Sequence, residues 1–463
     1  MRRLKLLALF AFLSASNINA QSAAQLQLTK LQQQFVDLRF GMFIHFNIPT
    51  YANADWPDPE LSPSVFNPVK LDADQWAKAA KSANMSYGCL TTKHHSGFCI
   101  WDTKTTNYNV MQSPYKKDVV RQYVDAFRAN GLKVMLYYSI LDTHHGLRPN
   151  QITPQHVKMV KNQITELLTN YGPLEALIID GWDAPWSRIG YDEIPFEEVY
   201  QLVKKLQPNC LLMDLNGAKY PGEGLYYTDI KTYEMGAGQR MPEKQKRMPT
   251  LACLPINSAW FWKTDFPTVP VRDPKKTVDE LIKPLNEASC NFILNVAPNR
   301  DGLIDENALK ALAEVGKLWK NAGPTTPLTV TDLPIISTNL AKGQASNSSW
   351  SDDMNIMDFA NDDNFKTSWT SNPAVKNPWY EISFKTPTTL NMAVIAERSA
   401  NIENYKLDYW NGKTWVLLFA GSNPNAIKLH RFESIKASKI RMQIESSKKN
   451  PSIAEFQLFN ERR

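Results

Sequence analysis

The chain has 463 residues, 43% of them hydrophobic and 11% aromatic, so it can bury about two or three domain cores and does not belong to the disordered class. Its formal net charge of +6 falls to +3 without Arg2, Arg3 and Lys5, and the other basic residues are dispersed, which argues against a nucleic-acid partner. Beyond residue 20 no apolar run is long enough to cross a bilayer, so we expect no membrane span.

The first twenty residues have the pattern of a signal peptide. Basic residues precede an apolar run at positions 6–13, and the small Ala20 suits cleavage. We therefore predict an exported protein, either periplasmic or secreted.

The cysteines favour neither a disulfide framework nor a zinc site. Their number is odd, no short spacing is repeated, and most stand in apolar, strand-like runs: Cys89, Cys99, Cys210, Cys253 and Cys290. We expect buried thiols that act as small core hydrophobes.

Strand-like and helix-like segments alternate through the first three hundred residues. The predicted strands are 39–46, 87–95, 133–139, 176–180, 210–214, 227–234, 250–256 and 291–298. The predicted helices are 23–37, 76–83, 118–129, 153–170, 196–206, 277–288 and 306–320. This alternation predicts an α/β fold, a (β/α)₈ TIM-like barrel over residues 21–330. No Gly-rich phosphate loop follows the first strand, which weakens the dinucleotide-binding alternative.

After residue 337 the segments become short and rich in β-formers. The predicted strands are 379–384, 392–396, 405–410, 415–419, 439–444 and 454–459, with turn residues between them. We predict an antiparallel β-sandwich over residues 337–463.

Asp180 is the most informative carboxylate. It ends the apolar strand 176–180 and is followed by Gly181, and a carboxylate at the end of a buried strand costs free energy unless it is paired or functional. In barrel enzymes these strand ends carry the catalytic groups. A helix-capping role for Asp180 is the structural alternative.

Other predicted strands end in histidines: His45 lies at the end of the first, and His94 and His95 lie at the end of the second. Adjacent residues of a strand point to opposite sides, so we assume that the second strand has already ended at these two histidines. Together with tryptophans they suit a sugar, whose apolar face stacks on indole while its hydroxyls bond to imidazole. The candidate aromatic walls are Trp56, Trp101, Trp182, Trp186 and Trp260. Zinc bound by the histidines and Asp180 is the weaker alternative, because it leaves the tryptophans without a role. His144 and His145 fit substrate contact and a solvated loop equally well.

Glycoside hydrolysis requires two carboxyl groups. Besides Asp180, Glu234 follows a strand-like run and precedes small residues that would leave it accessible. Glu223, in a Gly-rich loop, is the rival. The sequence modestly favours Glu234 over Glu223 as the second carboxyl group.

Four segments together resemble the α-L-fucosidases of glycoside hydrolase family 29. They are RFGMFIHF at 39–46, LTTKHHSGFCIW at 90–101, Asp180-Gly181, and FILNVAPNRDG at 292–302. The resemblance implies a retaining exo-hydrolase that needs no catalytic cofactor, with Asp180 as the nucleophile. It also implies that His45, His94 and His95 hold fucose hydroxyls and that Trp56 and Trp101 line the pocket.

The acid/base is the residue whose position is hardest to carry over from other members of this family. The segment 229–234 resembles the one that supplies it in one group of these enzymes, and 221–224 could match the segment used in another, so we expect Glu234 and keep Glu223 as the alternative. The chain departs from the family at Ile178, where a Trp often stands, and at 216–219, which replaces an Asn-Asp-Arg-Trp-like stretch.

The C-terminal part resembles a discoidin or coagulation-factor-type domain, a fold shared with carbohydrate-binding modules. The resemblance rests on 339–343, 360–369, 379–382 and 451–456. It implies a structural calcium near Asp362 and Asp363. A sandwich without any ligand is the alternative.

We therefore expect an exported α-L-fucosidase that acts on fucosylated oligosaccharides or glycoconjugates. A retaining exo-glycosidase for a related sugar such as an α-galactoside is one alternative. A non-catalytic glycan-binding protein is the other.

Overall fold

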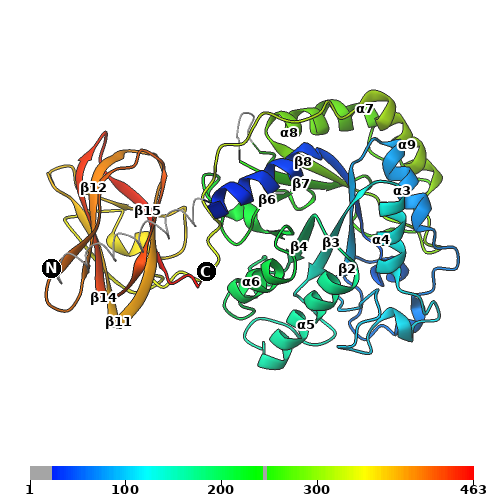
Figure 1. Cartoon of the computed structure of the whole chain (residues 1–463), viewed down its shortest axis with the longest axis horizontal. Helices are drawn as coiled ribbons and strands as arrows, with labels where there is room; N and C mark the ends of the chain where they lie inside the picture. The colour runs from blue at the N-terminus through cyan, green and yellow to red at the C-terminus, as the bar shows by residue number, and fades with distance from the viewer. Residues whose placement is uncertain (1–22, 243–247, 463) are drawn as a thin grey trace, which may run out of the picture. The chain divides into compact units, whose positions relative to one another are not determined.

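The computed structural model describes residues 23–242 and 248–462, which form two compact units that divide between Pro334 and Ile335 (Figure 1). The predicted signal peptide at residues 1–20 lies outside the described residues. Each unit is described by itself below.

The first unit contains an eight-stranded parallel sheet that curls into a nearly closed barrel, which confirms the predicted α/β barrel. Its strands are β1 (Phe40–Ile44), β2 (Tyr87–Lys93), β3 (Lys133–Ser139), β4 (Ala176–Asp180), β5 (Leu211–Asp214), β6 (Lys231–Glu234), β7 (Thr250–Pro255) and β8 (Cys290–Asn295). They are ordered β5-β4-β3-β2-β1-β8-β7-β6. Asp229 bridges the open side between β5 and β6, because its backbone N–H donates 2.7 Å to Leu212 O and its Oδ2 accepts 2.8 Å from Leu212 N.

Helices cover the outside of the strands (Figure 1). After a helix over residues 23–37 come α2 (Pro49–Ala52), η1 (Pro63–Val65), α3 (Ala73–Ser82), η2 (Val110–Gln112), α4 (Val119–Ala129), α5 (Pro154–Asn170), α6 (Phe196–Leu206), η3 (Gly217–Lys219), η4 (Met235–Ala237), α7 (Pro274–Lys276), η5 (Thr277–Ile282), α8 (Lys283–Glu287) and α9 (Glu306–Leu318). Most long helices lie within a few residues of their predicted bounds.

Side-chain caps explain where several helices begin. Asp72, Asp118 and Thr153 stand in extended backbone just before α3, α4 and α5, and each accepts hydrogen bonds from N–H groups of the first turn. The buried face of α4 consists of apolar and aromatic residues at helical spacing, which pack against the sheet. The predicted helix 277–288 is not a uniform α-helix, because the π-helical η5 precedes α8.

The second barrel strand ends before its two histidines, as assumed from the sequence. β2 stops at Lys93, and the N–H of Gly97, whose φ is +87°, donates to His94 O in a turn. His94 and His95 are therefore in a loop after the strand and do not alternate across the sheet.

The second unit is an antiparallel β-sandwich, as predicted. Its strands are β9 (Ala345–Ser348), β10 (Trp369–Thr370), β11 (Trp379–Glu397), β12 (Ile402–Trp410), β13 (Trp415–Ser422), β14 (Ile427–Ser447) and β15 (Ser452–Phe459), with a short helix η6 (Met357–Ala360). The predicted strands 379–384 and 392–396 are one long strand, β11, in which bulges interrupt the pairing with β14 and bend the strand.

The described residues include all five cysteines, each buried with a free thiol, which confirms the predicted core role. Across residues 23–242 and 248–462 we find no helix that combines the length and the apolar character needed to cross a membrane.

Candidate active site

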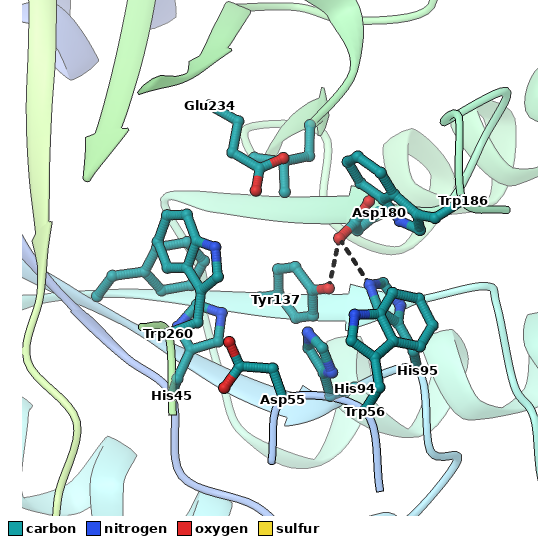
Figure 2. Close-up of a pocket in the computed structure, with 12 residues that line it drawn as sticks. His45, Asp55, Trp56, His94, His95, Tyr137, Asp180, Trp186, Glu234 and Trp260 are labelled. Atoms are coloured by element: carbon teal, nitrogen blue, oxygen red, sulfur yellow. Dashed lines mark hydrogen bonds and ion pairs between the residues drawn. The ribbon is translucent and has the colours of Figure 1, made fainter. Parts of the chain in front are cut away.

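The carboxyl ends of the barrel strands surround a cavity of about 250 Å³ (Figure 2). Pockets for drug-sized ligands have volumes of at least about 300 Å³. The smaller volume of this cavity suits a single monosaccharide. Its lining residues are Phe43, His45, Asp55, Trp56, His94, His95, Tyr137, Asp180, Trp186, Leu215, Glu234 and Trp260.

Most of the residues predicted for the site meet in this pocket. These are Asp180, Glu234, His45, Trp56, His94, His95 and Trp260, and Trp186 of the candidate aromatic walls joins them. Trp101 is elsewhere: its side chain is fully buried, and its indole N–H donates 2.9 Å to Glu166 Oε2. Glu223, the alternative acid/base, is exposed on a loop and does not line the pocket.

Asp180 is held by donors on both carboxylate oxygens. The Tyr137 hydroxyl donates 2.7 Å to Oδ2, and Asn216 Nδ2 donates 3.3 Å to Oδ1. His95 Nε2 lies 3.6 Å from Oδ2. Because Asp180 ends β4 and Tyr137 lies on the adjacent strand β3, sheet pairing places the two groups side by side.

The protonation of His95 follows from its neighbour Ser139. The Ser139 hydroxyl donates its single hydrogen 2.9 Å to Leu141 O, so it must accept the 2.7 Å hydrogen bond from His95 Nδ1. Burial lowers the pKa of His95 although the charge of Asp180 raises it. The neutral ring therefore carries its proton on Nδ1 and presents Nε2 to the pocket as an acceptor.

His45 is held by Asn295 in the same neutral tautomer, with its proton on Nδ1. The Asn295 amide donates 2.7 Å to Trp260 O, which orients its Oδ1 as the acceptor for His45 Nδ1, also at 2.7 Å. Burial lowers the pKa of His45 to about 3. His45 Nε2 is thus a second acceptor, and sugar hydroxyls are suitable donors for both.

His94 completes the group of imidazoles. Burial, with His95 and His45 nearby, lowers its pKa well below the ordinary value. Its Nδ1 is buried and has no hydrogen-bond partner within the described residues. A buried polar atom of this kind is costly until a ligand satisfies it.

Glu234 differs from Asp180 in its surroundings. Burial and the charge of Asp180 raise the pKa of Glu234 to about 8. Its Oε2 is buried and has no partner in the part of the chain that the structure describes. Two carboxyl groups in one pocket whose surroundings differ in this way suit one acid and one nucleophile.

Several pocket residues were not predicted from the sequence. Tyr137 looked like an ordinary strand residue, because nothing in the sequence shows that its ring faces the barrel interior. Asp55 precedes Trp56 in a loop, and its Oδ1 accepts 2.7 Å from Lys263 Nζ. Adjacency to Trp56 was the one signal that could have identified Asp55.

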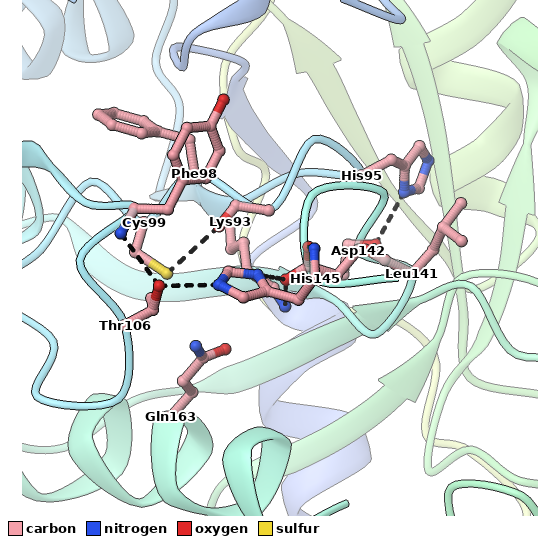
Figure 3. A network of polar contacts seen from close by, with 12 residues as sticks. Lys93, His95, Phe98, Cys99, Thr106, Leu141, Asp142, His145 and Gln163 are labelled. Atoms are coloured by element: carbon pink, nitrogen blue, oxygen red, sulfur yellow. Dashed lines mark hydrogen bonds and ion pairs between the residues drawn. The ribbon is translucent and has the colours of Figure 1, made fainter. Parts of the chain in front are cut away.

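A buried ion pair supports the loop that carries His94 and His95 (Figure 3). Lys93 Nζ and Asp142 Oδ2 are 3.1 Å apart, and both side chains are fully buried. His145 Nδ1 lies 2.9 Å from the same oxygen, and its Nε2 lies 2.8 Å from Thr106 Oγ1. The network joins the loop after β2 to the loop after β3.

The two adjacent histidines 144 and 145 belong to this scaffold and do not line the pocket. His144 stacks on Tyr108 at a centroid distance of 3.8 Å and bonds to Pro59 O, while His145 bonds to Asp142. Gly97 packs so closely here that a Cβ would lie 2.1 Å from Asp142 Oδ1, which explains a glycine at this position.

Among the described residues there is no group of three or more His, Cys, Asp or Glu side chains arranged to hold a metal ion. In the sandwich, Asp362 Oδ2 accepts 2.8 Å from Thr367 Oγ1, and Asp363 Oδ2 lies 3.3 Å from Lys342 Nζ. Asp363 therefore already has a cationic partner.

Glu455 is the sandwich carboxyl that best fits a cation. It is fully buried, and its Oε2 has no partner within the described residues. Burial, first, and then the nearby carboxyl groups of Asp362 and Asp363 raise the pKa of Glu455 to about 9. Carboxylate, hydroxyl and backbone carbonyl oxygens are calcium ligands, so Asp362, Glu455 and Thr367 fit this ion if carbonyl groups complete the shell.

The sequence was compared with known families and curated proteins. The family model "Alpha-L-fucosidase" matches residues 50–324, and "F5/8 type C domain" matches residues 342–456. Alpha-L-fucosidase 1 of Arabidopsis thaliana is 29% identical over 330 residues, which cover 67% of this chain and 61% of the relative. Putative alpha-L-fucosidase 1 of Oryza sativa subsp. japonica is 30% identical over 307 residues, covering 62% and 57%. The chain thus matches about three fifths of the length of these relatives.

Solved structures share the fold. Alpha-L-fucosidase isoenzyme 1 from Paenibacillus thiaminolyticus superposes with a TM-score of 0.54 at 24% identity, over 91% of this chain and 100% of that one. A Ruminococcus gnavus GH29 fucosidase in complex with fucose gives 0.51 at 22% identity, over 94% of each chain.

Proposed function

Because this chain belongs to the α-L-fucosidase family, we propose that it is an exo-acting, retaining α-L-fucosidase that releases L-fucose from fucosylated glycans. The observation that carries the proposal is the pair of carboxyl groups in one pocket. Asp180 accepts hydrogen bonds from Tyr137 and Asn216, whereas the raised pKa of Glu234 keeps that group protonated at neutral pH. One group can therefore attack while the other donates a proton.

In the first step a carboxylate oxygen of Asp180 bonds to the anomeric carbon as the glycosidic C–O bond breaks. Glu234 transfers its proton to the departing oxygen, so the aglycone leaves as an alcohol. In the second step the Glu234 carboxylate removes a proton from water, whose oxygen bonds to the anomeric carbon as the bond to Asp180 breaks. Two inversions at that carbon give net retention. The reaction needs no cofactor.

The pocket walls support fucose as the sugar. His45 and His95 present Nε2 acceptors to ring hydroxyls, and Trp56 and His94 add further surface. The lining also includes Phe43, Leu215 and Trp260, which offer apolar surface to the C6 methyl group of a 6-deoxy sugar. The C6 hydroxyl of L-galactose, which differs from L-fucose only by this group, would lose hydrogen bonds when buried against such a wall.

The first test is hydrolysis of an aryl α-L-fucoside by the protein, with aryl α-galactoside and β-glucoside as controls. We expect turnover of the fucoside and α-L-fucose as the first product by NMR. Preferred cleavage of the galactoside would favour the related-sugar alternative. Binding without turnover, also on natural fucosylated oligosaccharides, would favour the non-catalytic glycan-binding alternative.

The roles of the carboxyl groups are tested by azide rescue. Azide should trap the fucosyl-enzyme of Glu234→Ala as α-fucosyl azide, whereas Asp180→Ala should give β-fucosyl azide by direct displacement. Glu223→Ala is the matched control and should retain wild-type turnover. Rescue of Glu223→Ala instead of Glu234→Ala would reverse the acid/base assignment.

We further propose that the C-terminal domain binds a structural calcium through Asp362, Glu455 and Thr367, and that Asp363 pairs with Lys342 instead. The protein is also proposed to be exported by the signal peptide at residues 1–20, which is cleaved off in the mature protein. N-terminal sequencing of the mature protein tests this cleavage.

A further inference from the structure

Two tryptophans that line the pocket are partly exposed. Trp56 is 51% exposed and Trp186 is 37% exposed, whereas Trp182, four residues before Trp186, is fully buried. A large aromatic side chain left in water beside a binding site marks a surface for a ligand. The indole N–H groups differ in the same way: that of Trp182 donates 2.9 Å to Ile194 O, whereas that of Trp186 has no partner within the described residues.

The loop that carries Trp186 is held by contacts at its ends. After β4 the chain turns at Gly181, whose φ is +111°, and Trp182 enters the core. Asp183 N donates 2.8 Å to Ile189 O and closes a loop over residues 183–189, hereafter the Trp186 loop. Lys219 Nζ lies 2.7 Å from Asp183 Oδ2 and braces this loop against η3.

The Trp186 loop places the Trp186 indole beside the two carboxyl groups of the pocket, close to where the aglycone would leave. Trp186 lines the same cavity as Asp180 and Glu234, and its ring centroid is 6.5 Å from that of His95 (Figure 2). Trp56 stacks on the same imidazole at 4.7 Å. Fucose bound inside a cavity of about 250 Å³ leaves its aglycone at the open side, where the exposed indole lies.

We propose that Trp186 determines specificity for the aglycone by stacking on the apolar face of the sugar next to fucose. The Trp186 N–H can donate to a hydroxyl of that sugar. This inference rests on the proposed function, since it requires fucose in the inner cavity.

The test compares two substrates in Trp186→Ala. α-L-Fucosyl fluoride has no sugar leaving group, whereas fucosylated disaccharides linked to galactose or N-acetylglucosamine do. We expect kcat/KM for the best disaccharide to fall about 10-fold further than kcat/KM for the fluoride. Trp186→Phe should recover part of this difference, because a smaller aromatic face remains.

Trp350→Ala is the matched control, because Trp350 is 66% exposed in the other unit. It should leave both substrates at wild-type rates. Equal losses on the disaccharide and the fluoride in Trp186→Ala would overturn the inference, since the residue would then act on fucose or on folding. An undiminished disaccharide rate would also overturn it.

Failure of the proposed function is recognised separately, as a wild-type protein that leaves the fluoride intact. In that case, titration calorimetry tests the inference through ligand binding. Trp186→Ala should weaken the binding of the disaccharide by about 10-fold more than the binding of fucose. Equal weakening would overturn it.

Discussion

The Tyr137 hydroxyl donates a 2.7 Å hydrogen bond to Oδ2 of Asp180 from the neighbouring barrel strand. Burial first, and then the charge of Asp180, raise the pKa of Tyr137 well above its ordinary value, so the hydroxyl keeps its proton as a donor. The bond orients the proposed nucleophile before substrate enters.

Replacement of Tyr137 by Phe removes this bond and keeps the ring. Because hydrogen bonds to charged groups contribute about 1.5–3 kcal/mol, we expect kcat/KM for an aryl α-L-fucoside to fall about 10- to 100-fold. Tyr138→Phe is the matched control: Tyr138 is the next residue, and its hydroxyl donates to Gln163 outside the pocket. Equal losses in the two variants would contradict a specific role for Tyr137.

The pH dependence of the rate should report Glu234. The proposed acid acts in its protonated form, and its pKa is raised to about 8, so kcat/KM of the wild-type protein should decline as the pH rises through about 8. Glu234→Gln should lose this alkaline limb along with most of its activity on aryl fucosides with poor leaving groups. A limb that persists unchanged in Glu234→Gln would assign it to another residue.

The same carboxyl predicts a pH-dependent stability. The folded protein binds the Glu234 proton more tightly than the unfolded chain, so this contribution to stability is present below the unfolded pKa of about 4.5 and is lost as the pH rises through the folded pKa of about 8. Because a glutamine side chain cannot ionise, the Glu234→Gln variant does not lose this stability as the pH rises. Its Tm should therefore exceed that of the wild type more at pH 9 than at pH 5, as measured by differential scanning calorimetry. A constant difference in Tm would argue against the raised pKa.

The buried pair Lys93–Asp142 should contribute strongly to stability. Lys93→Met leaves Asp142 buried without its main cationic partner, and we expect the free energy of unfolding to fall by about 3–5 kcal/mol. Lys70→Met is the matched control, because the Lys70–Asp301 pair is exposed and should be worth less than about 1 kcal/mol. Chemical denaturation measures both. Similar losses in the two variants would show that burial of the pair is unimportant.

Calcium should stabilise the C-terminal domain through Glu455. Chelation with EDTA should lower one unfolding transition of the wild-type protein, and added calcium should restore it. Glu455→Ala should be insensitive to both treatments. Glu381→Gln should still respond, because Glu381 is a buried carboxyl of the same unit that pairs with Lys439 and Arg441. A calcium-dependent shift in Glu455→Ala would exclude Glu455 as a ligand.

The fold and several pocket residues could be predicted because they depend on local sequence. Apolar runs at a period of two or 3.6 residues define strands and helices, and their alternation predicts a barrel. In a barrel, polar residues at strand ends must share one mouth, which is why Asp180 and His45 could be grouped before their distance was known. That the second strand ends before His94 and His95 could only be assumed from the sequence, because the turn at Gly97 depends on its contact with Asp142 from another loop.

Only the tertiary structure decided which side chains face the cavity. Glu234 and Glu223 both stand among small residues in the sequence, yet one lines the pocket and the other is exposed. Trp101 ends the segment LTTKHHSGFCIW that resembles the family, and it is nevertheless a buried packing residue bonded to Glu166. The barrel, the sandwich and the strand ends that could carry chemistry were predictable, because they follow from the local periodicity of the chain. Side-chain direction, imidazole tautomers and the raised pKa of Glu234 depend on contacts between segments far apart in the chain, so only the folded structure could decide them.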